Sequence, residues 1–340
     1  MSEEYKPLLA ITMGDAAGSG PEIITKTLAD PEVRAVSRPV VVGDATIMQA
    51  ALEITGVPGE VKSIEKISAA SFQDDIIEVI DLRNIQLDKL TRGRVDPVAG
   101  KAAYEYIKLA TEMTLAGESD AIVTSAINKE ALNKAGYHYD GHTQLLAELC
   151  GGPEVAMMLV SGKLRVSHVS THVSLLRAIE RVRPERILTV LRLTDEAVRQ
   201  MGVAEPRLAV AGLNPHSGEG GLFGDEEIKY ITPTIEEARR QGMNVTGPLP
   251  PDSVFLRTSE GQFDAAIAMY HDQGHIAVKM LGITHGVNVT LGLPIIRTSV
   301  DHGTNFGKAG KGTADPTSLI LSIKLASVMC RNRRRLSRHD

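Results

Sequence analysis

The chain has 340 residues, of which 43% are hydrophobic and 23% charged, and its formal net charge is −5. This length exceeds one compact core, so two lobes are expected, and the composition is that of an ordinary globular protein. The negative charge argues against general binding to nucleic acids, because a phosphate backbone needs a positive surface. Cys150 and Cys330 form no CxxC motif and are expected to be free thiols in a reducing compartment.

The two ends of the chain show no export or membrane signal. The first residues, "MSEEYKPLLAITMGD", are acidic and contain too short an apolar run for a signal peptide. No apolar stretch reaches the roughly 20 residues that span a bilayer, so a cytoplasmic protein with no membrane partner is expected. The tail "RNRRRLSRHD" (331–340) contains five arginines, and a solvated, frayed terminus is favoured over binding to nucleic acid or lipid.

Short apolar runs rich in Val and Ile alternate with helical patterns along nearly the whole chain. The runs expected to be buried strands are 8–13, 39–44, 76–81, 120–125, 155–160, 164–170, 207–213, 264–270 and 286–292. Several are apolar on both faces, as in strands covered by helices on either side. Residues 99–117 and 225–242 have helical spacing, with Gly242 at a helix end. These repeated βα units predict an α/β fold.

The segment "TMGDAAGSGPEII" (12–24) leads from the first strand into a helix. Gly14, Gly18 and Gly20 precede Pro21, which suits a first helical turn. Such a turn exposes backbone N–H groups to an anion. It is neither GxGxxG nor a P-loop, so both a tight structural turn and part of a ligand site are open.

Polar residues also follow the predicted strand 120–125. Asn128 and Lys129 open a helix, and His142 and Thr143 follow Gly141 at a second helix start. In open α/β sheets ligands bind beyond the carboxyl ends of strands, where these residues fall. The alternatives, which spacing alone favours, are an N-cap role for Thr143 and a satisfied surface position for His142.

Three histidines, His172, His216 and His271, each follow a predicted strand. Imidazoles at one sheet edge can converge, and three of them suit a divalent transition metal that keeps positions open for substrate. A structural role for each is the alternative. Further candidates are His168, His275 and His285.

Lys279, Asn288 and Arg297 recur at nine-residue intervals near apolar strands. A lysine, an amide and a guanidinium together suit a phosphate monoester. A solvated face is the alternative, but Asn288 and Arg297 lie in apolar stretches where an unpaired polar group is costly. The Gly-rich segment that follows suits a backbone cradle for a nucleotide and contributes Asp301, His302, Gly303 and Thr304.

Together these motifs resemble the 4-hydroxythreonine-4-phosphate dehydrogenase family of pyridoxal phosphate biosynthesis. The matching segments lie in family order across about residues 8–330: "ITMGDAAGSGPEI", "VTSAINKEAL", "GHTQLLA", "GLNPHSGEGGLFGDEE", "GPLPPDSVF", "MYHDQGHIAVK" and "VNVTLGLPIIRTSVDHGT". The resemblance implies a fold like isocitrate and isopropylmalate dehydrogenases, with two α/β lobes, an active site in the cleft between them, and a homodimer. The lobes are expected at 1–135 with 300–340, on the nucleotide side, and at 136–299, for metal, substrate and dimerisation.

Position by position, the resemblance implies metal ligands at His172, His216 and His271, one of which reaches the site from the partner subunit. It implies substrate contacts at His142, Thr143, Lys279, Asn288 and Arg297. Cofactor contacts are expected at Gly14, Asp15, Asp301, His302, Gly303 and Thr304. The cofactors are NAD or NADP and one divalent metal ion, with zinc preferred and cobalt, manganese or magnesium as alternatives. The general base is open between Asp252, Asp272 and Lys279, and Asp272 alternatively orients a ligand imidazole.

The sequence departs from the biosynthetic enzymes: His275 replaces a hydrophobic residue, "PHSGE" replaces "PHAGE", and "VTSAINK" lacks a proline. A sister branch of the family oxidises 4-phosphorylated threonate or erythronate in sugar-acid catabolism, and "HDQGH" is closer to that branch. The predicted reaction is therefore metal-dependent oxidation of the C3 hydroxyl of 4-phospho-D-threonate or erythronate, followed by decarboxylation. The alternative substrate is 4-phosphooxy-L-threonine, and a phosphate-ester transferase and a non-catalytic sugar-phosphate sensor are alternative classes.

Overall fold

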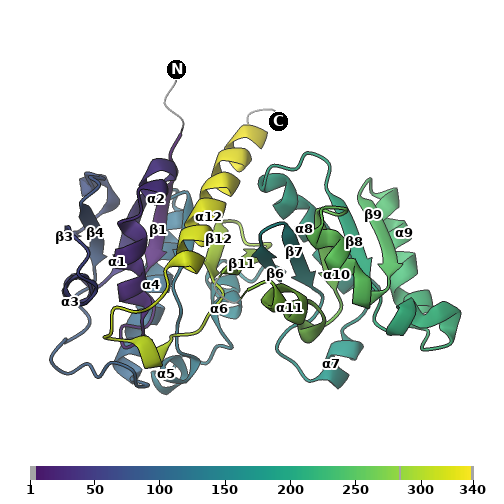
Figure 1. Ribbon diagram of the computed structural model, residues 1–340, viewed down its shortest axis with the longest axis horizontal. Helices are drawn as coiled ribbons and strands as arrows, with labels where there is room; N and C mark the ends of the chain where they lie inside the picture. Colours follow the sequence, from purple (N-terminus) through teal and green to yellow (C-terminus); the bar gives the residue numbers. More distant parts are fainter. Residues whose placement is uncertain (1–4, 283–284, 338–340) are drawn as a thin grey trace. The chain divides into compact units, whose positions relative to one another are not determined.

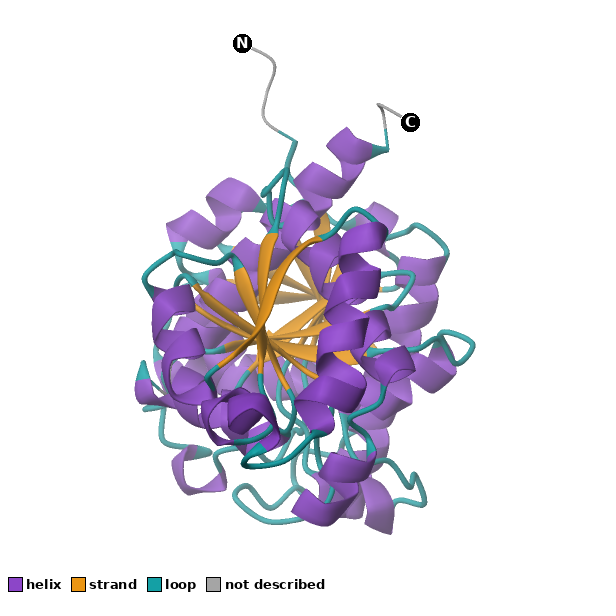
Figure 2. Cartoon of the chain, turned by 90° about the vertical axis from the view of Figure 1, so that its right-hand side faces the viewer, coloured by secondary structure: helices purple, strands orange, loops and turns teal. Residues whose placement is uncertain are grey.

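The chain folds into two compact units, seen here in a computed structural model that describes residues 5–282 and 285–337 (Figure 1). Unit 1 comprises residues 1–153 and 293–340, and unit 2 comprises residues 154–292. Each unit is a sheet with helices packed against it, so the predicted α/β class is confirmed. Figure 2 shows the helices on the outside of the strands.

The unit boundaries differ from those expected after residues 135 and 299. Helix α6 (His142–Leu149) packs on α4 (Pro97–Leu115), and strand β12 (Ile296–Val300) pairs with β5 (Ala121–Thr124). Both elements therefore belong to unit 1, and they bring His142, Thr143 and Arg297 with them. The observed boundaries fall in the Gly/Pro segments 151–153 and 292–294, so short turns of this composition mark both of them.

Unit 1 has a parallel sheet in the order β3-β4-β2-β1-β5-β12. Its remaining strands are β1 (Leu8–Thr12), β2 (Arg38–Gly43), β3 (Glu60–Ile64) and β4 (Ile76–Asp81). Its remaining helices are α1 (Gly20–Leu28), α2 (Pro31–Val36), α3 (Ala45–Thr55), α5 (Lys129–Lys134) and α12 (Thr317–Leu336), with short 3-10 turns at Ile67–Ala69 and Phe306–Lys308. Strands β1, β5 and β12 are wholly buried, as expected for parallel strands covered on both faces.

Unit 2 has a mixed sheet in the order β11-β6-β7-β10-β8-β9. The pairs β11–β6 and β6–β7 are antiparallel, the second of them a hairpin, and the other pairs are parallel. The strands are β6 (Ala156–Ser161), β7 (Leu164–His168), β8 (Arg207–Ala211), β9 (Asn244–Leu249), β10 (Ala265–Ala268) and β11 (Val287–Leu291). The helices are α7 (Leu175–Glu180), α8 (Pro184–Gln200), α9 (Thr232–Arg240), α10 (Pro251–Ser259) and α11 (His271–Met280), with a 3-10 segment η2 (Pro215–Gly221) and a π-helical turn η3 (Glu227–Ile231).

The core of unit 2 lies between its sheet and the helices α10 and α11. Leu159 and Val166 of the sheet pack there with Phe255 of α10 and Val278 of α11. This packing fixes the face of α11 on which its histidines stand, because Val278 lies seven residues after His271, about two helical turns. None of the described helices is long and apolar enough to cross a membrane.

Candidate active site

The Gly-rich turn after β1 is built around backbone that only glycine tolerates. Gly14 has a φ of 76°, and a Cβ atom there would lie 2.5 Å from the carbonyl oxygen of Ala126. The next residue, Asp15, is 1% exposed, and its Oδ1 accepts a hydrogen bond from the N–H of Ala17 at 2.8 Å. Burial raises the pKa of Asp15 to about 6. The segment is thus a tight structural turn that holds a carboxyl group at the carboxyl end of β1.

The second Gly-rich segment, 301–304, lies directly beside this turn. The carbonyl oxygen of Thr304 accepts a hydrogen bond from the N–H of Ser19 at 3.0 Å. A Cβ on Gly18 would lie 2.7 Å from the same oxygen, so the close approach requires glycine. The predicted cofactor contacts therefore come together in unit 1, although they are almost 300 residues apart in the sequence.

Arg297 lies in the interior of unit 1, on β12. It is 2% exposed, and its Nε and Nη2 donate to Oγ1 of Thr124 on the neighbouring strand at 3.1 and 2.6 Å. Burial lowers the pKa of Arg297 to about 9, so the guanidinium keeps its positive charge at neutral pH. A buried cation at a strand end of a parallel sheet is suited to an anionic ligand group.

His142 stands in the electric field of two cations. Its Nε2 is buried and has no hydrogen-bond partner among the described residues. Burial, and then the positive charges of Arg297 and Lys129, lower the pKa of His142 well below its usual value, so the ring is neutral. The interpretation as a satisfied surface histidine is therefore wrong. An unpaired buried nitrogen beside two cations indicates a place for an anionic group with a donor, such as a phosphate or a carboxylic acid.

Sequence reasoning placed Lys129 beyond a strand end but did not assign it to the site, and the alternative role of Thr143 as an N-cap is wrong. Lys129 is the first residue of α5, after the N-cap Asn128, and its Cε lies 3.6 Å from where a Cβ on Gly141 would stand. Its position one residue past a cap at a strand end was the available signal. The N-cap of α6 is Gly141, and Thr143 is the second residue of the helix, so Thr143 does not cap it.

In unit 2, four histidines form a cluster of rings. His271 and His275 of α11 are stacked, with ring centroids 3.6 Å apart and planes 14° apart. The ring centroids of His172 and His271 are 5.5 Å apart, and Nε2 of the buried His168 lies 3.1 Å from Nδ1 of His275. His168 and His275, the spare candidates, therefore support the predicted ligand His271. His285 is exposed.

The orientation of His271 is set by its neighbour. Oδ1 of Asp272 lies 2.6 Å from Nδ1 of His271, and since a carboxylate only accepts, Nδ1 is the donor, which makes Nε2 the nitrogen through which this ring can bind a metal. A carboxylate on the far nitrogen is the usual support of a metal-binding imidazole. Asp272, which the sequence left open between base and orienting group, makes the contact of an orienting group.

Two of the three predicted metal ligands have the spacing that a shared ion requires. With metal–nitrogen bonds of about 2.1 Å, two imidazoles on one ion have ring centroids roughly 5 Å apart, close to the 5.5 Å between His172 and His271. Across residues 5–282 and 285–337, no group of three His, Cys, Asp or Glu side chains is arranged to hold a metal ion. His216 lies instead beside Phe223, 6.2 Å between ring centroids, in a run of left-handed backbone. The described residues of one chain therefore bring two of the three predicted ligands to this centroid spacing and do not make up a metal site by themselves.

The other candidate residues lie on separate elements. Lys279 is half-buried on α11, and its positive charge contributes to a lowered pKa of His275, so it lies near the histidines. Asp252 is exposed in the first turn of α10. Asn288 lies on β11 opposite Leu159. Lys279 and Asn288 therefore belong to unit 2, whereas Arg297, the third member of the predicted phosphate receptor, belongs to unit 1.

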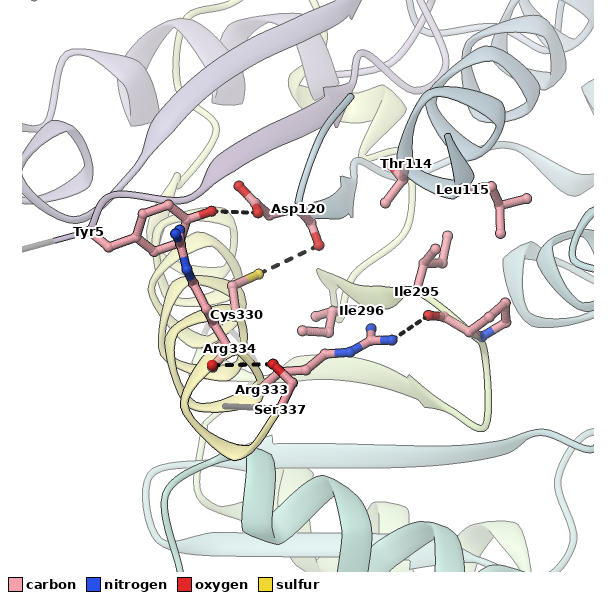
Figure 3. A pocket seen from close by; sticks show the side chains of 11 residues that line it. Tyr5, Thr114, Leu115, Asp120, Ile295, Ile296, Cys330, Arg333, Arg334 and Ser337 are labelled. Atoms are coloured by element: carbon pink, nitrogen blue, oxygen red, sulfur yellow. Dashed lines mark hydrogen bonds between the residues drawn. The ribbon is translucent and has the colours of Figure 1, made fainter. Parts of the chain in front are cut away.

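Two arginines of the Arg-rich tail line a cavity at the amino ends of the unit 1 strands (Figure 3). It has a volume of about 530 Å³ and lies where β1, β5 and β12 begin. The guanidinium of Arg334 lies 4.1 Å from the ring centroid of Tyr5, and Arg333 donates to the carbonyl of Pro294 at 2.8 Å. The expectation of a frayed terminus is wrong for these residues, because α12 continues to Leu336. Residues 338–340 lie outside the described residues.

Unit 2 contributes the histidine pair, and unit 1 contributes the buried Arg297, the exposed Lys129 and the Gly-rich turn. Such a set of groups is typical of an α/β enzyme that binds polar ligands. Comparison with known proteins identifies the family of the chain. The family model described as "Pyridoxal phosphate biosynthetic protein PdxA" matches residues 35–326, and the chain belongs to this family. The resemblance inferred from the motifs is thereby confirmed.

Its similar relatives are dehydrogenases. The chain is 47% identical over 331 residues to D-threonate 4-phosphate dehydrogenase of Cupriavidus necator, covering 97% of this chain and 99% of the relative. It is 48% identical to the protein of that name from Pectobacterium atrosepticum, covering 94% and 98%. The solved structure of 4-hydroxythreonine-4-phosphate dehydrogenase from Klebsiella pneumoniae is 45% identical, covers 96% and 100%, and has a TM-score of 0.86. The chain is therefore a dehydrogenase, and its family implies a nicotinamide cofactor and a metal ion.

Proposed function

We propose that the chain oxidises the C3 hydroxyl of 4-phospho-D-threonate, or of the erythronate epimer, with NAD or NADP, and that the β-keto acid formed loses CO2. Two curated relatives at 47–48% identity over nearly the whole chain have this phosphorylated acid in their name. A solved relative of similar identity is named for 4-hydroxythreonine 4-phosphate. This makes the amino acid the second candidate, which differs from phosphothreonate in the group on C2.

The observation that carries the proposal is the group formed in unit 1 by the cations Arg297 and Lys129 and the neutral His142. Both candidate substrates end in a phosphate, and a guanidinium with a neighbouring ammonium is a suitable receptor for it. The unpaired Nε2 of His142 supports an additional contact with the ligand. Lys279 and Asn288, which stand on unit 2, are proposed as further contacts, together with Thr143 of α6.

We place the metal ion at His172 and His271, with Asp272 orienting the second imidazole. A divalent ion bound there would acidify the C3 hydroxyl and favour the enolate that forms when CO2 leaves. Imidazole nitrogen ligands suit zinc, with cobalt or manganese as alternatives and magnesium less suited because it prefers oxygen.

Lys279 is our choice as the group that exchanges the hydroxyl proton. It lies close to the histidine cluster, whereas Asp272 is engaged with His271 and Asp252 stands exposed on another helix. In the oxidation the C3 hydrogen leaves with its electron pair to the nicotinamide, and the O–H proton passes to this base. In the second step the C2–carboxylate bond breaks, its electrons form the enolate, and a proton is returned to C2.

We infer that a second copy of the chain completes the site with the third histidine. Support comes from the apolar side chains that unit 2 exposes near its histidines: Leu175, Leu176, Leu222, Phe223, Ile228, Ile276, Met280 and Leu281. Clusters of exposed apolar residues mark protein interfaces. Ile276 and Met280 are four residues apart on α11, so they share one exposed face of the helix that carries His271.

The decisive experiment is NADH formation by the purified protein with zinc, cobalt, manganese or magnesium. Rates with 4-phospho-D-threonate, its erythronate epimer and 4-phosphooxy-L-threonine are compared. A rate confined to the hydroxy acids supports the proposal, and a rate confined to the amino acid replaces it with the second candidate. No NADH with any of them, but acyl transfer to phosphate, would move the chain to the transferase class.

A further inference from the structure

The Gly-rich segment after Thr304 is fastened to α1 by a buried carboxylate. Glu22 is 2% exposed, and its two oxygens accept hydrogen bonds from the N–H groups of Gly310 and Gly312 at 2.5 and 2.7 Å. The two backbone amides are thus held by one carboxylate from a distant part of the chain. Hydrogen bonds to a charged acceptor are stronger than those between neutral groups, and burial strengthens them further.

One helical turn later, a lysine holds the other polar groups of the same segment. Nζ of Lys26 donates to the carbonyl oxygens of Gly312 and Ala314 at 2.5 and 2.9 Å. Glu22 and Lys26 stand four residues apart on α1, so they share one face of the helix. The carboxylate accepts hydrogen bonds from N–H groups and the ammonium donates to C=O groups, so each charge faces the oppositely charged end of the backbone dipole.

Together with the bond between Ser19 and Thr304, these contacts attach both ends of residues 304–314 to α1. The segment contains Gly307, Gly310 and Gly312, and glycine-rich backbone has many conformations unless tertiary contacts select one. A loop ordered before its ligand arrives loses less conformational entropy on binding. The contacts of Glu22 and Lys26 should therefore increase the affinity of the loop for its ligand as well as the stability of the fold.

We propose that Glu22 and Lys26 are positioning residues that hold the loop 304–314 in the shape that receives the nicotinamide cofactor. This inference rests on the proposed function, in which the Gly-rich turn at 14–15 and residues 301–304 contact the cofactor. Neither side chain is expected to touch the reacting atoms, because Glu22 is buried against the loop backbone.

The test compares Glu22→Gln with Glu78→Gln. Glu78 is also 2% exposed, and its carboxylate also accepts two backbone N–H groups, of Ser71 and Phe72, but it holds a segment before β4 that has no predicted contact with the cofactor. The amide of glutamine turns a donor toward one of the two N–H groups in each case. Both variants should therefore lose similar stability in urea unfolding, while only Glu22→Gln should raise the Kd and KM for NAD, by about tenfold, with kcat within about twofold.

Lys26→Met provides a second variant if Glu22→Gln does not fold, and it should raise the KM for NAD in the same direction. The Kd for NAD alone is measured by calorimetry, beside steady-state kinetics with the phosphorylated acid. NAD affinity that is unchanged in both α1 variants, or equally weakened in Glu78→Gln, overturns the positioning role and leaves the proposed function intact. A wild-type protein that neither binds nor reduces NAD would overturn both.

Discussion

The buried carboxyl group of Asp15 destabilises the folded state when it is ionised, so its effect on stability depends on pH. Its pKa is raised to about 6 in the folded protein from a usual value of 3.8, chiefly by burial. Between these two values the folded state binds more protons than the unfolded state, so rising pH lowers the free energy of unfolding. Above about pH 6 the free energy of unfolding is lowered by the full amount, and below about pH 4 Asp15 no longer lowers it.

Asp15→Asn should therefore stabilise the protein at alkaline pH and have little effect in acid. The amide keeps an acceptor for the N–H of Ala17, and it removes a destabilisation of up to about 3 kcal/mol at pH 8. Urea unfolding of both proteins at pH 5 and pH 8 measures the difference. A gain in stability that is larger at pH 5 than at pH 8 would contradict the assignment. As a predicted cofactor contact, Asp15 should at the same time be important for NAD binding.

Asp272→Asn should weaken metal binding without unfolding the protein. The side chain of Asp272 is exposed, and its contact with Nδ1 of His271 fixes the ring that we assign to the metal. Loss of such a support costs about 10- to 100-fold in metal affinity. Competition with a chelator measures the affinity directly. Asp225→Asn, which removes another exposed carboxylate of unit 2, serves as the control and should leave the affinity unchanged.

At the scale of elements, α5 reaches its position because α4 has a glycine where the two helices touch. A Cβ on Gly100 would lie 2.3 Å from the carbonyl carbon and oxygen of Ala131. Gly100→Ala should therefore push α5 away and reduce stability by about 1–3 kcal/mol. Because α5 begins with Lys129, the KM for the phosphorylated substrate should rise as well.

Urea unfolding and steady-state kinetics check both expectations. Lys101→Ala at the neighbouring exposed position loses only a surface ion pair with Glu105 and should stay within about 0.5 kcal/mol of the wild type. If Gly100→Ala were as stable and as active as this control, the close contact between α4 and α5 would have no role in placing Lys129.

The elements that follow regular hydrophobic patterns were predictable, and those that break the pattern were not. All nine apolar runs contain strands, and Gly242 has the left-handed φ of 85° expected at a helix end. Three strands were missed for physical reasons. Strand β3 is a polar edge strand, β9 contains Gly247 and Pro248, and β12 buries Arg297 together with Thr298 and Ser299. Polar residues, glycine and proline predict a loop from the sequence alone, and they form a strand here because a neighbouring strand supplies their hydrogen bonds.

At the scale of the whole molecule, activity should depend on association of two chains. Ile276 is 62% exposed on the helix that carries His271, and a glutamate there would place a charge in the apolar face that we assign to the dimer. Ile276→Glu should shift the protein to monomer and lower both metal affinity and kcat by at least about tenfold. Light scattering after size-exclusion chromatography measures the mass of the particle.

Val98→Glu is the matched control, because Val98 is 55% exposed on α4, a helix of unit 1 that carries none of the four clustered histidines. It should leave mass and activity unchanged. An Ile276→Glu protein that is monomeric but fully active and metal-bound would show that one chain holds a complete site, and the proposed contribution of a second copy would be wrong.

The sequence by itself determined the fold class, the family and the kinds of chemical group in the site. Alternating apolar and helical patterns reflect burial of strands under helices, and the order of motifs reflects a shared ancestry of the whole chain. His271 was proposed because it follows a predicted strand, Arg297 because it lies in an apolar stretch where an unpaired polar group is costly, and His142 through the family resemblance.

Only the tertiary structure decided which of these groups meet. It joined Lys129 and His142 to Arg297, stacked His275 on His271, left His216 apart from that pair, and tied Glu22 to a loop almost 290 residues later. These contacts depend on strand order and on which helix face turns inward. Periodicity along the chain reports whether a side chain is buried, but the identity of its neighbour is set by how distant strands pair, which one sequence does not encode locally.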